Sequence, residues 1–228
     1  MSFLIELKHI ISLEKLKLRL WYNKGVSYQK KKIFKEHHND LLFIHIPKTA
    51  GISLVKSLYD IDYSNHATIF DYLREDSSRA KHMISFAVVR NPYSRLISAY
   101  NYLRDDGRSI IDKAWNDMYL KTYRSLDDFV KKGGLEKAIN RNAEHFIPQN
   151  KFIYASGSLY VDEVFKLENM EKLYDFLKTH QIQEVKDLNR GKRNNIDKDC
   201  FLSMPAIAIV NELYHEDFSI FDYQKKKA

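Results

Sequence analysis

A lysine in a loop of small residues is the first feature of this sequence that could do chemistry. The segment after the apolar run 41–46 reads Pro47, Lys48, Thr49, Ala50, Gly51, Ile52 and Ser53. Small residues let backbone N–H groups approach an anion, a helix that begins here adds the positive end of its dipole, and Lys48 adds a full charge. The segment is predicted to bind a phosphate-like group, with an ordinary strand-to-helix turn and a solvated lysine as the alternative.

Arg90 and Ser98 form a second candidate anion site. Arg90 directly follows the apolar run 84–89, and Ser98 stands eight positions later, about two turns into the helix that we expect at 93–104. A guanidinium and a hydroxyl at this spacing could hold one further phosphate, so the two sites together predict a ligand phosphorylated at two places. Taken alone, Arg90 is also compatible with a structural ion pair, and Arg95 is assigned either to such a pair or to a substrate contact.

The first loop lacks the GxxxxGK[ST] spacing of ATP- and GTP-binding loops. ATP or GTP hydrolysis therefore cannot be inferred from it. A kinase is kept as an outside alternative, and it would show magnesium-dependent binding of ATP.

These motifs require a scaffold in which strand ends meet, and the chain alternates apolar runs with helical patterns, as parallel strands with crossover helices do. The expected fold is α/β, a three-layer domain with a mostly parallel central sheet flanked by helices. Strands are expected at 41–46, 84–89, 151–154 and 161–167. Helices are expected at 51–59, 93–104 (with Pro92 in its first turn), 126–131, 135–145, 169–178 and 205–214.

The net charge of +7 lies at the two ends of the chain. Residues 1–40 carry +5 and Lys225–Lys227 carry +3, which leaves −1 for residues 41–224. A nucleic-acid-binding domain usually carries a basic stripe on its folded part, so no nucleic acid partner is expected. The oligomeric state is not indicated by the sequence.

Two regions are predicted, a basic helix and linker at 1–40 and a folded α/β domain at 41–228. A helix at 3–21 either docks on a folded domain or lies on an anionic membrane surface, and residues 1–35 are the candidate membrane contact. Within the linker, His37 and His38 are expected to be solvated, because no further ligands stand at zinc-like spacing.

The compartment is expected to be the cytoplasm, with peripheral membrane contact as an option. Cys200 is the single cysteine, so no disulfide can form within the chain. No run reaches the roughly 18 apolar residues of a membrane span, and no cleavable leader is recognised.

In motif and order, the chain resembles the sulfotransferases that use 3′-phosphoadenosine 5′-phosphosulfate (PAPS). It is most similar to the carbohydrate type, which includes heparan sulfate 2-O-sulfotransferase and bacterial family 2 relatives. FIHIPKTAGIS resembles that family's 5′-phosphosulfate loop, and FAVVRNPYSRLISAY resembles its 3′-phosphate segment. Weaker matches are NHATIFDYLR, HFIPQ, FKLEN and LYHEDFSIFDY, and the resemblance covers residues 41–223.

The resemblance implies a P-loop-like fold and assigns roles to particular residues. Lys48 would contact the phosphosulfate bridge, Arg90 and Ser98 the 3′-phosphate, and His66 would be the catalytic base. An imidazole suits that task because its pKa lies near neutrality. His145 and Glu144 are rival bases, and the segment His145–Gln149 could instead line the acceptor cleft.

A polar, basic loop at 189–194 is a further candidate for donor binding. Related sulfotransferases close such a loop over the donor, which would assign Arg190 and Lys192 to the phosphates, whereas a solvated turn is the alternative. The loop does not reproduce the RKGxxGDW pattern of the soluble small-molecule enzymes. The tyrosines between 93 and 123 are assigned to helix packing, with sugar stacking as the alternative.

The predicted function is transfer of a sulfuryl group from PAPS to a hydroxyl of a carbohydrate or glycan, without a metal. One alternative is a sulfotransferase that acts on a lipid, a small alcohol or a peptide tyrosine. Another is a non-catalytic membrane-surface or assembly protein that retains the nucleotide-binding fold.

Overall fold

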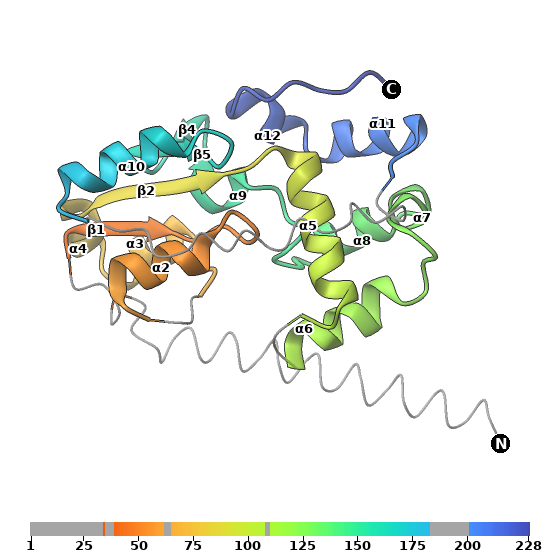
Figure 1. Ribbon diagram of the computed structural model, residues 1–228, viewed down its shortest axis with the longest axis horizontal. Helices are drawn as coiled ribbons and strands as arrows, with labels where there is room; N and C mark the ends of the chain where they lie inside the picture. The colour runs from red at the N-terminus through yellow and green to blue at the C-terminus, as the bar shows by residue number, and fades with distance from the viewer. Residues whose placement is uncertain (1–33, 35–38, 62–64, 108–109, 183–200) are drawn as a thin grey trace. The chain divides into compact units, whose positions relative to one another are not determined.

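The computed structural model describes residue 34 and residues 39–61, 65–107, 110–182 and 201–228 (Figure 1). The chain divides into two compact units, Met1–Lys35 and Glu36–Ala228. The expected helix at 3–21, His37 and His38, and the loop 189–194 with Arg190 and Lys192 lie outside the described residues. All features below belong to the second unit.

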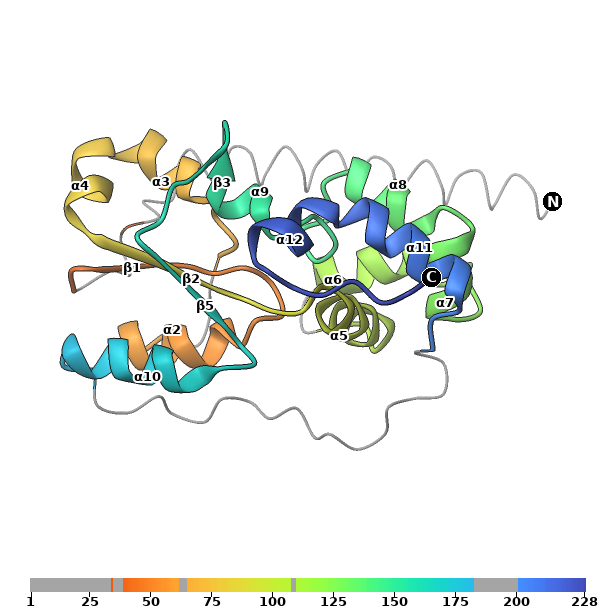
Figure 2. The ribbon, with the colours of Figure 1, turned by 90° about the horizontal axis from the view of Figure 1, so that it is seen from above.

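A parallel sheet organises the second unit. Among the described residues it has three strands in the order β1 (Leu41–Ile44), β2 (Ile84–Val89) and β5 (Glu163–Lys166), with Phe43 opposite Phe86 and Val88 opposite Phe165. Helices α2 (Gly51–Tyr59) and α10 (Met170–Thr179) lie on one side of it, and α3 (Ile69–Glu75) and α4 (Ser77–His82) lie on the other (Figure 2). The three-layer α/β prediction is confirmed.

The apolar strand sequences form the sheet because both of its faces are covered. Alternate residues of β1 and β2, such as Phe43 and Phe86, join Leu54 of α2 and Leu173 of α10 in one buried cluster. The hydroxyl of Tyr59, at the end of α2, donates to the Leu41 carbonyl at 3.1 Å and accepts from the Phe43 N–H at 3.0 Å. Helix α2 is thus tied to β1 by hydrogen bonds as well as by packing.

A group of helices follows the carboxyl end of β2. Helix α5 (Pro92–Arg104) begins with Pro92 at the position expected for it, and the Asn91 side chain caps it by accepting from the Tyr93 and Ser94 N–H groups. The other members are α6 (Ile110–Trp115), the π-helical turn η2 (Asn116–Leu120), α7 (Leu126–Lys131), α8 (Gly134–Asn140), α11 (Met204–Leu213) and α12 (His215–Ile220). Their inward faces share a second buried cluster that includes Tyr100, Phe129 and Val210.

Two of the expected elements need correction. The expected strand 151–154 is instead a short helix, α9 (Asn150–Ile153), followed by the hairpin β3 (Tyr154–Ala155) and β4 (Ser158–Leu159). The cause is tertiary, because the carboxylate of Asp217 accepts the N–H groups of Gln149 and Asn150 and so caps this turn from α12. The expected helix 135–145 ends early, since Asn142 adopts a left-handed conformation (φ 54°).

Candidate active site

The loop after β1 leads into helix α2 through two residues in the left-handed region. Lys48 has φ 71° and Ala50 has φ 65°, a conformation that costs a residue other than glycine about 1–2 kcal/mol. The hydroxyl of Thr49 donates to the Ile46 carbonyl at 2.8 Å, which ties the turn to its own strand. Strain of this kind is tolerated where the backbone must present its N–H groups in a fixed direction.

The first turn of α2 carries no side chain that would repel an anion. Within the described structure, Ala50 makes no side-chain capping bond, and the first turn contains no acidic residue. Ile52 is half-buried, while Ser53 is buried, so a ligand would meet mainly backbone N–H groups here.

His45 explains why the helix begins with glycine. The His45 ring is buried, and a Cβ at position 51 would overlap it. The missing side chain of Gly51 therefore makes room for an imidazole of the protein, which is a structural role that the loop composition did not reveal.

Two arginines from the second strand segment hold the loop in place. The Arg90 guanidinium donates to the Lys48 carbonyl at 3.3 Å, and Nε of Arg95 donates to the Pro47 carbonyl at 3.1 Å. The structure thus brings the two predicted anion sites together at one edge of the sheet. Arg95 is 1% exposed, and burial lowers the pKa of its guanidinium, which agrees with a structural role better than with a substrate contact.

Gln149 and Asp217 fix the backbone at Arg90. The Gln149 amide accepts from the Arg90 N–H and donates to the Arg90 carbonyl, both at 2.9 Å. The backbone N–H of Gln149 donates in turn to Asp217 at 2.8 Å. Gln149 and Asp217 are both fully buried, so Gln149 lies beneath the site rather than in an open acceptor cleft.

The third strand end joins the same network. Glu168, just after β5, accepts the Asn91 N–H at 2.8 Å with one oxygen and the Tyr223 hydroxyl at 2.8 Å with the other. Asp217 and Tyr223 both belong to the LYHEDFSIFDY motif, which therefore supports the carboxyl ends of the strands.

One face of α5 points at the loop. Arg95 contacts Pro47, and seven residues later the Tyr102 ring lies under the Lys48 ammonium, 3.7 Å from Nζ to the ring centroid. Ser98 is three residues after Arg95 and four before Tyr102, so helical geometry places it between them on this face. Ser98 is half-buried, which is compatible with its predicted phosphate contact.

Three histidines from distant parts of the chain meet beside Lys48. The His66 ring centroid is 4.5 Å from that of His45 and 5.8 Å from that of His145. Nδ1 of His66 lies 3.1 Å from the His45 carbonyl oxygen. Since a carbonyl only accepts, Nδ1 carries the proton, and Nε2 is left as the basic atom.

His45 and His145 are poorly suited to take up a proton. Burial lowers the pKa of His45 well below its usual value, and burial together with the charge of His66 lowers the pKa of His145 to about 3. Both rings are therefore neutral near pH 7. Nδ1 of His145 is buried and makes no hydrogen bond within the described structure.

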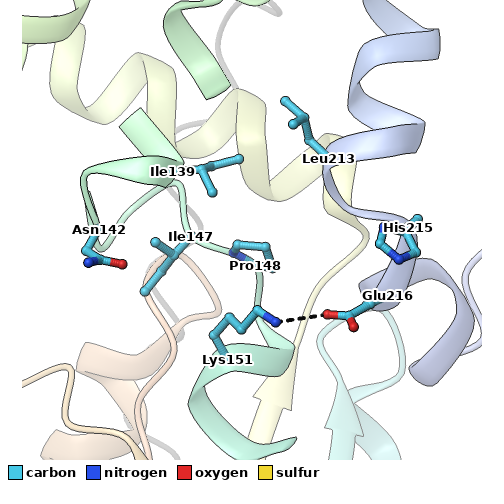
Figure 3. A pocket seen from close by; sticks show the side chains of 8 residues that line it. All are labelled: Ile139, Asn142, Ile147, Pro148, Lys151, Leu213, His215 and Glu216. Atoms are coloured by element: carbon cyan, nitrogen blue, oxygen red, sulfur yellow. Dashed lines mark hydrogen bonds and ion pairs between the residues drawn. The ribbon is translucent and has the colours of Figure 1, made fainter. Parts of the chain in front are cut away.

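A pocket of about 390 Å³ lies outside this site (Figure 3). The Lys151–Glu216 ion pair, at 3.1 Å, crosses it between α9 and α12. Its lining consists of Ile139, Asn142, Ile147, Pro148, Lys151, Leu213, His215 and Glu216. Ile147 and Pro148 belong to the segment His145–Gln149, which was the alternative prediction for the acceptor cleft; none of the other described residues that were predicted to bind donor or acceptor is in that lining.

Sequence reasoning missed His45 and Asp217 as parts of the site, and it assigned Tyr102 to helix packing or sugar stacking rather than to a contact with Lys48. The signals were weak: His45 is a polar residue directly after an apolar strand, Tyr102 stands one turn after Ser98, and Asp217 lies in a motif to which no role was assigned.

In the part of the chain that the structure describes, no group of three or more His, Cys, Asp or Glu side chains is arranged to hold a metal ion. No helix in that part is long and apolar enough to cross a membrane.

A comparison with protein families identifies the family to which the chain belongs. The model of the sulfotransferase family matches residues 31–224, which include both segments that were predicted to bind anions and the Asp217 motif. The chain belongs to the sulfotransferase family. This sulfotransferase is accordingly a transferase that moves a sulfuryl group, as its motif order predicted. No curated protein and no solved structure gives a significant match.

Proposed function

We propose that this sulfotransferase moves the sulfuryl group of PAPS to a hydroxyl of a carbohydrate or glycan. The observation that carries the proposal is the hydrogen bond from the Arg90 guanidinium to the Lys48 carbonyl. It joins a cation at the end of β2 to the loop at the N-terminus of α2, so that one ligand with phosphates at its 5′ and 3′ positions can span both.

The chemistry follows from these positions. An acceptor oxygen attacks sulfur in line, the bond from sulfur to the bridging oxygen breaks, and 3′,5′-adenosine bisphosphate leaves. Lys48 and the N–H groups of residues 51–53 would offset the charge that develops on the leaving phosphate. The acceptor proton would go to Nε2 of His66, because Nδ1 already donates to the His45 carbonyl.

The carbohydrate acceptor is supported by the order of the motifs and by His66 standing between the two donor segments. Arg90 and Ser98 would bind the 3′-phosphate, and no metal takes part. An acceptor cleft lined by cations would favour acidic glycans.

The donor assignment is tested by calorimetric titration with 3′,5′-adenosine bisphosphate. Wild type is expected to bind, and Lys48→Ala and Arg90→Ala are each expected to weaken binding at least about tenfold, as loss of a charge-assisted hydrogen bond does. Lys178→Ala, which removes an exposed lysine of α10, is the control and is expected to bind as wild type does. Undetectable binding by wild type at millimolar ligand would refute the assignment.

The base is tested separately with His66→Ala. Donor affinity is expected to persist within about threefold, while the rate of transfer from PAPS to a glycan acceptor falls by about 10²–10⁴, the usual contribution of general base catalysis. An unchanged rate would remove His66 from the mechanism and would direct attention to Glu144.

A further inference from the structure

We propose that Tyr102 is a positioning residue that holds the Lys48 side chain ready for the donor. The inference rests on the proposed function, because it takes Lys48 as the residue that meets the 5′ end of the donor. The sequence assigned this tyrosine to helix packing or sugar stacking, and neither the motifs nor the family match gives it a role toward Lys48.

The contact itself is close. Nζ of Lys48 lies 3.7 Å from the centroid of the Tyr102 ring, within the range in which a ring face attracts a cation. A lysine has a flexible four-carbon stem and loses rotamer freedom when its end is fixed. If the Tyr102 ring already holds the Lys48 ammonium, the Lys48 side chain loses less rotamer entropy when the donor binds. The ring does this without neutralising the positive charge of Lys48.

Tyr102 is itself held firmly. Its hydroxyl donates to Oδ2 of Asp112 at 2.8 Å, and Asp112 is 6% exposed. Gly107 has φ +58°, and a Cβ there would overlap Asp112, so this glycine lets the carboxylate approach α5. The Asn116 amide bonds the Arg104 carbonyl and Asp106, which fixes the turn at the end of α5.

His145 completes the arrangement. Its ring stacks with that of Tyr102, with centroids 5.3 Å apart and an angle of 21° between the planes. Because burial keeps His145 neutral, this ring supports Tyr102 without repelling Lys48. The Tyr102 ring therefore positions Lys48, and the buried carboxylate of Asp112 in turn positions Tyr102.

The first test observes the contact without altering Tyr102. In the ligand-free enzyme labelled with ¹³C-lysine, the ε-methylene signal of Lys48, identified by its absence from Lys48→Arg, is expected to be shifted upfield by the ring current. An unshifted signal would overturn the proposal, whatever the behaviour of the variants.

The second test compares two ligands. Tyr102→Leu is expected to weaken binding of 3′,5′-adenosine bisphosphate about tenfold, the scale of one partly desolvated cation–π contact. Binding of adenosine 3′-phosphate, which lacks the 5′ group, is expected to stay the same. Tyr102→Phe, which keeps the ring, is expected to bind the bisphosphate within about threefold of wild type. Tyr123→Leu, a half-buried tyrosine packed on Phe129, is the matched control and is expected to have no effect.

A double-mutant cycle separates positioning from general damage. In a Lys48→Ala background, Tyr102→Leu is expected to have no further effect on binding of the bisphosphate. An equal loss in that background, or an equal loss for adenosine 3′-phosphate, would show a merely structural role. If wild type does not bind the bisphosphate at all, the proposed function fails and the role of the contact fails with it, while the Lys48 signal still reports whether the contact exists.

Discussion

The ends of β1 and β2 lie side by side in the sheet but are held in different ways. The loop after β1 is shaped mainly by its own sequence neighbours, through the left-handed Lys48 and Ala50, the Thr49–Ile46 hydrogen bond and the fit of Gly51 against His45. The backbone at Arg90, after β2, is held by Gln149 and, through it, by Asp217. The first strand end is thus shaped by local contacts and held from outside by Arg90 and Arg95, whereas the backbone at the second depends on residues far along the chain.

Because of this difference, the two strand ends are expected to be sensitive to different kinds of substitution. Local geometry is sensitive to changes in backbone preference and in the size of one side chain. A buried polar network is sensitive to the removal of a single partner, because each remaining group is then left unsatisfied away from water. Three of the four substitutions below probe these two kinds of support, and the fourth probes the neutral His145 beside them.

The largest effect is expected from Asp217→Ala. Burial raises the pKa of this carboxyl, and its N–H donors on Gln149 and Asn150 oppose that shift. Removing it leaves those donors and the buried Arg95 without their acceptor or counter-charge, at a cost of about 3–5 kcal/mol of unfolding free energy. Urea denaturation measures this, and Asp175→Ala, whose side chain is 79% exposed, is expected to cost under about 0.5 kcal/mol. Equal losses for the two would show that the β2 end does not depend on its network.

Gly51→Ala is expected to cost about 3 kcal/mol, because the new Cβ overlaps the buried His45 ring. The double variant Gly51→Ala, His45→Ala is expected to be more stable than Gly51→Ala alone, since the smaller side chain removes the overlap. Thermal unfolding compares the two. A double variant that is less stable than Gly51→Ala would show that the ring is not the obstacle.

His145→Phe is expected to alter the pH dependence of stability. The unfolded chain takes up a proton at His145 near pH 6.5, whereas the folded chain does so only near pH 3, so acidification through this range favours unfolding. Wild type should lose about 2–3 kcal/mol more than His145→Phe between pH 7 and pH 4. Parallel stability curves for the two proteins, from denaturation at each pH, would contradict the burial of a neutral imidazole.

The smallest effect is expected from Ala50→Gly, and its sign is informative. Glycine adopts φ 65° without penalty, so this change is expected to stabilise the protein by about 0.5–1 kcal/mol. The same change at Ala208, an exposed position within α11, is expected to destabilise it by about 1 kcal/mol. Denaturant midpoints of both variants decide the point, and destabilisation at position 50 would mean that the loop is not strained there.

Much of the fold was predictable because it depends on local pattern. The continuous apolar runs at 41–46 and 84–89 indicated buried parallel strands, of which the first ends at Ile44, and helices 51–59 and 126–131 have the expected bounds. Helix α9 was not predictable, because its N-terminus is capped by Asp217 from α12 and the local sequence resembles a strand.

Some residues of the candidate site could be predicted from the sequence and others could not. Lys48 and Arg90 could be singled out from the sequence, because a cation at the carboxyl end of a buried strand is a local signal for anion binding. The side chains that orient them, Tyr102 for Lys48 and Gln149 for the Arg90 backbone, are ordinary residues whose role depends on what folds against them.

The sequence by itself determined the strands, the cations at their ends and the membership of a sulfotransferase family, because each follows from residue order over short stretches. Only the tertiary structure decided that His45, His66 and His145 share one cluster, and that the His45 carbonyl leaves Nε2 of His66 as its basic atom. The physical reason is that such contacts join residues far apart in the chain, and their geometry exists only once the sheet and its helices have packed.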